Sequence, residues 1–171
     1  KTLNEKGDIT VDGKKVKFTL ISEDDAGDPK QGPVVAQKLV DAGVVGVVGH
    51  LTSGVCIPAS SVYANAGVVA VSPSCTSPDY TLKSQKTPNG AVSAYRVVAT
   101  DTQQSPVLAK FILSKGGKNI AIVDDASQYG KGLADEVTKN LKAGGANITN
   151  RESATDKTTD FTAILTDINA Q

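Results

Sequence analysis

Short apolar runs alternate with longer amphipathic segments along most of the chain, and the runs end at turn signals. A run such as residues 44–48 has the length and the β-branched side chains of a strand. Residues 131–143 carry apolar side chains at the spacing of one helix face. Strands that alternate with helices of this length predict an α/β fold, with parallel sheets flanked by helices and right-handed crossovers.

The individual elements follow from this pattern and from Gly, Pro and Asp signals at their ends. The predicted strands are 16–21, 44–48, 68–71, 94–98, 120–123 and 146–151. The predicted helices are 55–66, 102–115, 131–143 and 160–169, with one more opening at Asp28-Pro29 and a helix end over residues 1–7. Asp12-Gly13 predicts a hairpin-like turn. The fully apolar run 44–48 is typical of a strand covered on both faces, and Asp101 is expected to cap the helix that follows it.

The best candidate for a domain boundary is 99–102, where a strand gives way to a helix that begins a second series of strand–helix units. No linker rich in Gly, Ser or Pro divides the chain. We therefore expect residues 1–99 and 100–171 to belong to two different lobes.

Charge and cysteine content narrow the function classes. The chain has 18 Lys and Arg against 18 Asp and Glu, so it lacks the basic surplus of a nucleic-acid-binding protein. Cys56 and Cys75 come without the further Cys or His ligands that zinc requires. If the strands before them are neighbours, the two cysteines form a disulfide; the alternative is two buried thiols.

Polar loops follow three of the predicted strands, at the sheet edge where α/β proteins bind ligands. Loop 49–54 and loop 72–78 are rich in hydroxyl groups and contain no acid, Lys or Arg. Main-chain N–H groups at a helix start, with the hydroxyls of Ser53 and Thr76, suit a carboxylate. The alternative for Ser53 is that it only caps the following helix. The third loop is 124–130.

Motifs of other functions fail in detail. Gly130-Lys131-Gly132 lacks the third glycine of a dinucleotide-binding loop, and Val55 stands where a P-loop needs Lys. The GxSxG nucleophile motif is absent. His50, the only histidine, is interpreted as a packed structural residue rather than a catalytic one. The acids at 23–25 are interpreted as a solvated strand end.

Six segments in order resemble the leucine/isoleucine/valine-binding family of periplasmic binding proteins. They are DDAGDPKQ at 24–31, VVGHLTSG with IPAS over 47–60, SPSCTSP at 72–78, DTQQ at 101–104, YGKGLA at 129–134 and DFTAIL at 160–165. The resemblance covers nearly the whole chain. It implies a two-lobe type I periplasmic binding protein architecture that closes over its ligand.

The resemblance also implies a binding site. Ser53, with the Gly54 beside it, and Thr76 would hold the ligand's carboxylate, Ser74 would offer its carbonyl to the ammonium, and Tyr129 would close over the ligand from the other lobe. Many family members have cysteines where this chain has Gly27 and Thr52, so that disulfide is not expected here.

We therefore expect a periplasmic, non-enzymatic receptor that delivers a small amino acid or related carboxylate to the membrane permease of an ABC importer, without cofactor, metal or nucleic acid. A ligand-sensing regulatory domain of the same fold is the first alternative, and an α/β enzyme is the second. The resemblance also leads us to expect an incomplete chain. The family has a strand and a helix before residue 1 and further units after residue 171, so residues 1–171 alone should bind amino acids poorly and associate. The identity of the ligand stays open.

Overall fold

The computed structural model describes residues 2–7 and 9–170 of the 171-residue chain. Its helices are α1 (Thr2–Lys6), α2 (Gln31–Asp41), α3 (Ser53–Ala66), α4 (Asp79–Leu82), α5 (Asp101–Ser114), α6 (Gln128–Ala143) and α7 (Thr162–Asn169). Its strands are β1 (Thr10–Val11), β2 (Lys14–Lys15), β3 (Gly46–Val48), β4 (Val69–Ser72), β5 (Ala94–Arg96), β6 (Asn119–Asp124) and β7 (Asn147–Ser153). The architecture is α/β, as predicted.

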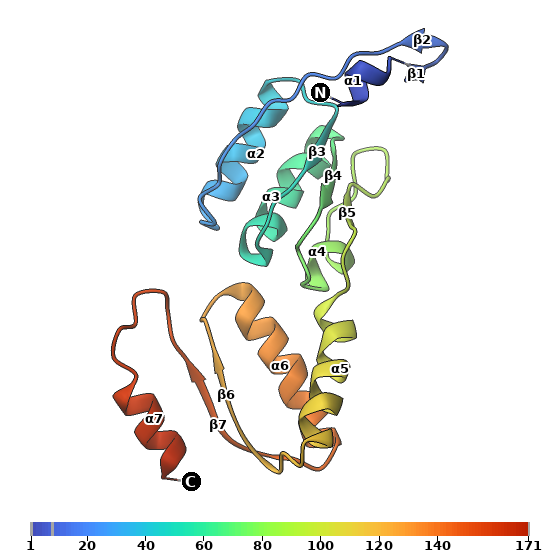
Figure 1. The fold of residues 1–171 in the computed structure, drawn as a ribbon. Coiled ribbons are helices and arrows are strands. Elements are labelled where there is room, and N and C mark those ends of the chain that lie inside the picture. Colours follow the sequence, from blue (N-terminus) through green and yellow to red (C-terminus); the bar gives the residue numbers. More distant parts are fainter. Residues whose placement is uncertain (1, 8, 171) are drawn as a thin grey trace.

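The first half of the chain builds a parallel sheet in the order β3-β4-β5. Gly46 pairs with Val69 and Ala70 with Ala94, so the strands run side by side in chain order. Helices α2 and α3 lie next to each other and pack on this sheet (Figure 1). Their contact buries Val35, Leu39 and Tyr63, and this core supports the sheet from which the loops extend.

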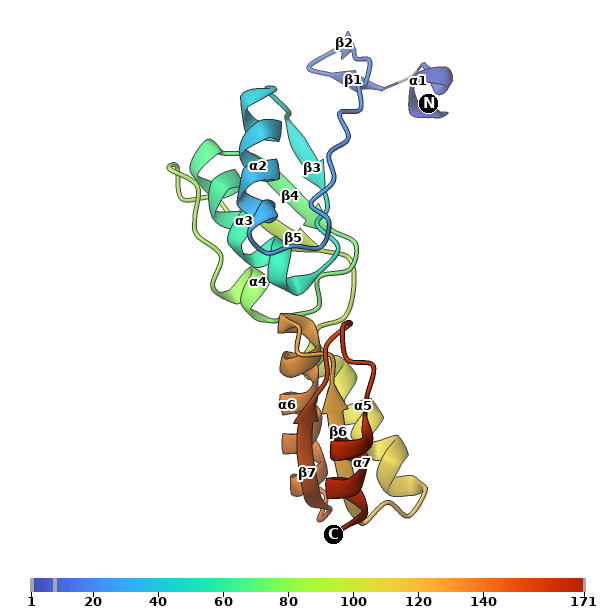
Figure 2. The ribbon, with the colours of Figure 1, turned by 90° about the vertical axis from the view of Figure 1, so that its left-hand side faces the viewer.

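The second half builds a parallel pair of strands, β6 and β7. Helices α5 and α6 pack against each other and enclose a core that includes Val137 and Leu141. Figure 2 shows α7 on the opposite side of this sheet from α6. The chain passes from one half to the other between β5 and α5 (Figure 1). The assignment of two lobes divided between residues 99 and 100 stays a prediction.

The predicted strand at residues 16–21 is wrong. Within residues 2–7 and 9–170 the segment has no ladder partner, and Phe18 and Leu20 are exposed. Instead, the Phe18 N–H donates to Asn4 Oδ1, and Asn4 Nδ2 donates to the Phe18 carbonyl oxygen, each at 2.7 Å. The residue types favour a strand, but a strand forms only where a neighbour completes its hydrogen bonds.

The predicted starts of several helices are also shifted. Asp28 does not cap α2 directly, because its side chain accepts the N–H of Lys30 in a turn before the helix. In α5 the N-cap is Thr100, in a capping box with Gln103, and Asp101 is the first helical residue. Helix α6 begins at Gln128 rather than at 131, because the Ser127 side chain accepts the Gly130 N–H. Helix α3 begins two residues before the predicted start at 55, and α7 two residues after the predicted start at 160.

The apolar run at 44–48 is not covered on both faces. Val45 is 93% exposed and Val48 85%, whereas Val47 packs against the core. The helices of this half cover only the face of β3 that carries Val47. The prediction that this strand is covered on both faces is therefore wrong. Among the described helices, none combines the length and the apolar character needed to cross a bilayer.

A disulfide joins Cys56 and Cys75, whose Cα atoms lie 6.6 Å apart. Cys56 lies in the first turn of α3, and Cys75 follows β4. Since β3 and β4 are neighbours, the loops after them meet, and of the two alternatives for the cysteines the disulfide is confirmed.

Gly32 of α2 packs directly against Val55 of α3. A Cβ at this position would lie 2.9 Å from the main-chain oxygen of Val55. We expect Gly32→Ala to lower the free energy of unfolding by about 1–3 kcal/mol, because the helices must separate. Gly132→Ala in α6 is the control, since its Cβ would meet only Asp101 at 3.6 Å. Denaturant unfolding that left Gly32→Ala as stable as the wild type would contradict this packing.

The disulfide closes a chain segment with a sequence separation of 19 residues. Cys75→Ser should therefore cost about 3 kcal/mol of stability, mainly through the freer unfolded chain. Thiol titration of the denatured, unreduced protein should find neither Cys56 nor Cys75 free. Two reactive thiols in that titration would disprove the bond.

Candidate functional site

One cavity collects all five residues that the sequence predicted for a ligand site. It has a volume of about 710 Å³ and draws its walls from both halves of the chain. The first half contributes Gly27, Pro29, Leu51, Thr52, Ser53, Gly54, Ser74 and Thr76, and the second contributes Asp125, Ala126, Ser127, Gln128 and Tyr129. The structure thus brings the five residues together, and their contacts with a ligand stay a prediction.

The N-terminus of α3 opens onto this cavity. Thr52 is the N-cap residue, and Ser53 and Gly54 are the first two residues of the 14-residue helix. Among the described residues, no acceptor pairs with the main-chain N–H of Ser53 or Gly54. Free N–H groups at the positive end of a helix dipole form an anion-binding position.

The Ser53 hydroxyl does not cap its helix. It is 2% exposed and accepts the main-chain N–H of Ser77 at 3.3 Å. Because the oxygen already accepts a hydrogen bond from the protein, its own proton remains available for an acceptor in the cavity. The interpretation of Ser53 as only a helix cap is therefore wrong.

Two other hydroxyls of the cavity wall are buried and have no hydrogen-bond partner in the part of the chain that the structure describes. They are Oγ1 of Thr52 and Oγ1 of Thr76. Burial raises the pKa of the Asp101 carboxyl above its ordinary value, and the nearby Thr76 hydroxyl opposes this shift without reaching hydrogen-bonding geometry. Buried polar groups are normally paired, so a pair of orphaned hydroxyls in one wall indicates room for a polar ligand.

Ser74 is held by a residue that sequence analysis did not single out. The buried Ser72 hydroxyl donates to the His50 carbonyl at 2.7 Å and accepts the N–H groups of Ser74 at 3.2 Å and Cys75 at 2.8 Å. It thereby ties the loop after β4 to the loop after β3. In the described part of the chain, no donor reaches the Ser74 carbonyl oxygen, which leaves it available to a cation.

His50 is a structural residue, as its sequence context indicated. Nδ1 lies 2.6 Å from Asp25 Oδ2, and Nε2 lies 2.9 Å from the hydroxyl of Tyr63. Burial, with smaller contributions from Tyr80 and Asp25, raises the pKa of Tyr63 to about 12. Both ring nitrogens are therefore occupied, which removes the basis for a catalytic triad. Asp25 is a partner of His50 rather than part of a solvated strand end.

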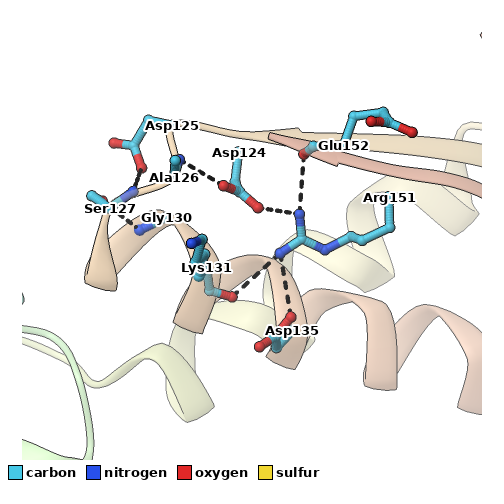
Figure 3. A network of polar contacts seen from close by, with 9 residues as sticks. All are labelled: Asp124, Asp125, Ala126, Ser127, Gly130, Lys131, Asp135, Arg151 and Glu152. Carbon is cyan, nitrogen blue, oxygen red and sulfur yellow. Dashed lines mark hydrogen bonds and ion pairs between the residues drawn. The ribbon is translucent and has the colours of Figure 1, made fainter. Parts of the chain in front are cut away.

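The facing wall comes from the end of β6 and the start of α6. Tyr129 lies in the first turn of α6, not in a loop as the sequence suggested. Figure 3 shows the network that supports this segment: Asp124 binds Arg151 of β7, and Arg151 also contacts Asp135 of α6 at 3.2 Å. The other Asp124 oxygen accepts the Ala126 N–H at 2.7 Å. The network holds the end of β6 in place, and the residues that follow it form this wall of the cavity.

The cavity wall is nearly neutral. No Lys, Arg or His of the described chain lines it, and Asp125 is its only Asp or Glu. Leu51, Pro29 and Tyr129 add apolar surface beside the polar groups. Such a cavity can hold an anion by dipoles and hydroxyls, while the apolar surface takes a hydrocarbon group.

Comparison with known proteins agrees with this geometry. A family model described as periplasmic binding protein matches residues 1–171. The Leu/Ile/Val-binding protein BraC3 of Rhizobium johnstonii is 42% identical over 170 residues, which cover 99% of this chain and 44% of that protein.

Solved structures with a similar fold are also binding proteins. An ABC transporter substrate-binding protein of Desulfitobacterium hafniense in complex with Leu is 30% identical, with a TM-score of 0.70 over 99% of this chain and 48% of that one. The branched-chain amino acid transporter substrate-binding protein LivJ of Streptococcus pneumoniae, in complex with isoleucine, is 26% identical, with a TM-score of 0.78 over 99% of this chain and 46% of that one. The chain thus spans a little under half the length of the proteins it matches.

The Asp124–Arg151 pair predicts a pH-dependent stability. Burial alone would raise the pKa of Asp124, but hydrogen bonds from Arg151, the Ala126 N–H and Ser153 outweigh it, and the pKa lies below its ordinary value. A depressed carboxyl pKa stabilises the fold above the unfolded value of about 3.9, and this contribution is lost as pH falls through the folded pKa.

We therefore expect Arg151→Met to lower the free energy of unfolding by about 1–3 kcal/mol at pH 7, because the Asp124 carboxylate loses its charged hydrogen-bond donor. The difference from the wild type should shrink below about pH 4. Lys139→Met on α6 is the control, and denaturant unfolding should show a change within about 0.5 kcal/mol. A difference between Arg151→Met and the wild type that stayed constant down to pH 3 would contradict the role of the pair.

Proposed function

The chain belongs to the periplasmic binding protein family, and from this premise we propose that it is part of a receptor that binds a small aliphatic amino acid for an ABC importer. The observation that carries the proposal is the cavity in which Ser53, Gly54, Ser74, Thr76 and Tyr129 meet. The family is one of binding proteins, which speaks for a receptor and against an α/β enzyme.

The carboxylate of the ligand binds at the N-terminus of α3. The unpaired N–H groups of Ser53 and Gly54, the Ser53 hydroxyl and the orphaned Thr76 hydroxyl are its donors. Hydrogen bonds to a charged group are short and about twice as strong as neutral ones. This donor set explains how an anion is held without Lys or Arg in the described wall.

The other end of an amino acid finds complementary groups in the same cavity. The ammonium binds the Ser74 carbonyl oxygen, and the aliphatic side chain lies against Leu51, Pro29 and Tyr129. The preference for an aliphatic amino acid is supported by the relatives, which include a Leu/Ile/Val-binding protein and binding proteins solved with leucine and with isoleucine. Tyr129 lies on the half opposite to Ser53 and closes over the ligand.

Membership of the family supports a setting for the receptor. The protein acts outside the cytoplasmic membrane, in the periplasm, and passes its ligand to the permease subunits of the importer. Residues 1–99 and 100–171 belong to two lobes, and the ligand bridges them. Relatives described as substrate-binding proteins of ABC transporters support this setting.

The carboxylate contact is tested with Ser53→Ala in the complete natural protein. Titration calorimetry with leucine, isoleucine and valine should show binding weakened by about 1.5–3 kcal/mol, or about 10- to 150-fold, because a hydrogen bond to a charged group is lost. The effect should be similar for all three amino acids, since the variant changes the shared carboxylate position.

Ser60→Ala provides a matched control on the same helix. The Ser60 hydroxyl donates to the Ile57 carbonyl at 2.7 Å and lies outside the cavity wall. Its removal should leave affinity unchanged within about two-fold. Equal affinities of Ser53→Ala and the wild type for every amino acid tested would refute the carboxylate site.

A further inference from the structure

Arg96, the last residue of β5, binds the loop that carries Thr76. Its Nη1 donates to the carbonyl oxygens of Cys75 at 2.8 Å and Ser77 at 2.7 Å, and its Nη2 donates to Thr81 Oγ1 at 2.8 Å. The guanidinium also lies over the ring of Tyr80, with Cζ 5.5 Å from the centroid. Arg96 does not line the cavity, so it has no direct contact with a ligand there.

The two carbonyls that Nη1 binds flank Thr76. The carbonyl between them, that of Thr76 itself, accepts the main-chain N–H of Asp101 at 3.0 Å. Three successive carbonyls are thus held by hydrogen bonds, two from Arg96 at the end of β5 and one from the first residue of α5. Because the peptide unit is planar, fixing three carbonyls in a row leaves Thr76 little freedom in its main-chain dihedrals.

An arginine is suited to this task in a way that a lysine is not. The guanidinium is planar and presents several N–H groups in a rigid fork, which can bind carbonyls two residues apart while stacking on an aromatic ring. A lysine ammonium is a single point on a flexible stem. It would keep the positive charge but would not hold both carbonyls and Thr81 at once.

We propose that Arg96 is a positioning residue for the ligand site: it holds the main chain on both sides of Thr76, so that the Thr76 hydroxyl is set in the cavity wall before a ligand arrives. The inference rests on the proposed function, because it gives Thr76 a ligand to meet. Arg96 acts through Thr76 and without touching the ligand.

A double-mutant cycle on ligand affinity tests this in the complete natural protein. The variants are Arg96→Lys, Thr76→Ala and the two combined, titrated with leucine by calorimetry. Arg96→Lys should weaken binding about ten-fold, which corresponds to about 1.4 kcal/mol. On the Thr76→Ala background the same change should cost less than about two-fold, because residues that act as a unit are not additive.

Thermal unfolding of each variant separates positioning from stability. If Arg96 served stability alone, Arg96→Lys would lower the unfolding midpoint and leave the affinity of the folded protein unchanged, and the proposal would be wrong. It would also be wrong if the losses from Arg96→Lys and Thr76→Ala multiplied. In both cases the proposed function would still stand if Thr76→Ala weakened binding. If Thr76→Ala or Ser53→Ala had no effect on binding, the carboxylate site itself would be in error.

Two further variants complete the test. Thr81→Val removes the nearer acceptor of Nη2, leaves the Pro78 carbonyl at 3.5 Å and keeps Arg96, so it should give a smaller loss of about three-fold that also vanishes on the Thr76→Ala background. It serves in place of Arg96→Lys if that variant does not fold. Lys83→Gln removes an exposed charge just after α4 that pairs with Asp79, and affinity within two-fold of the wild type is expected. A loss as large as that of Arg96→Lys would contradict the proposal, because it would mean that a change near this loop weakens binding even when the held carbonyls are untouched.

Discussion

The parallel pairing of β3 with β4 brings the ends of two strands to one edge of a sheet, and every contact of the candidate site in the first half depends on it. Val48 is opposite Val71, so the loops that follow leave the sheet side by side. The neighbouring loops then share a disulfide, the Ser77–Ser53 hydrogen bond and the Ser72 hydroxyl. Without this register, Ser53 and Thr76 would belong to separate surfaces.

The two walls of the cavity are stabilised by different means. Around Ser53 and Thr76 the contacts are largely between neutral groups, with Arg96 placed behind the loop. The second half uses an ion-pair network, in which Arg151 links β6, β7 and α6 (Figure 3). None of the side chains that the first half contributes to the cavity wall is charged, and Asp124, Arg151 and Asp135 of the second half bind one another rather than lining the cavity.

Sequence reasoning succeeded where the signal is local. Asp12-Gly13 predicted a reversal that β1 and β2 confirm, and Gly67 ends α3 with a left-handed conformation at φ 71°. Alternating strands and helices were enough to place Ser53 and Thr76 at the same sheet edge. These predictions need only a residue's own conformational preference or the order of elements along the chain.

It failed where the outcome depends on a distant partner. Residues 16–21 have the composition of a strand but find no strand to pair with. Asp25 meets His50 across 25 positions of sequence, and Arg96 meets the Cys75 carbonyl across 21. Such contacts carry no local pattern, because one partner is often a main-chain group that every residue has. The ligand roles of the five predicted residues rest on the family resemblance and on their shared cavity.

The disulfide also changes the covalent topology of the chain. Together with the backbone between Cys56 and Cys75, it forms a closed ring that contains most of α3 and all of β4. A single proteolytic cut anywhere inside that ring would turn it into a branched molecule rather than into two pieces. The residues before Cys56, with Ser53, and those after Cys75, with Thr76, would then remain parts of one covalent unit.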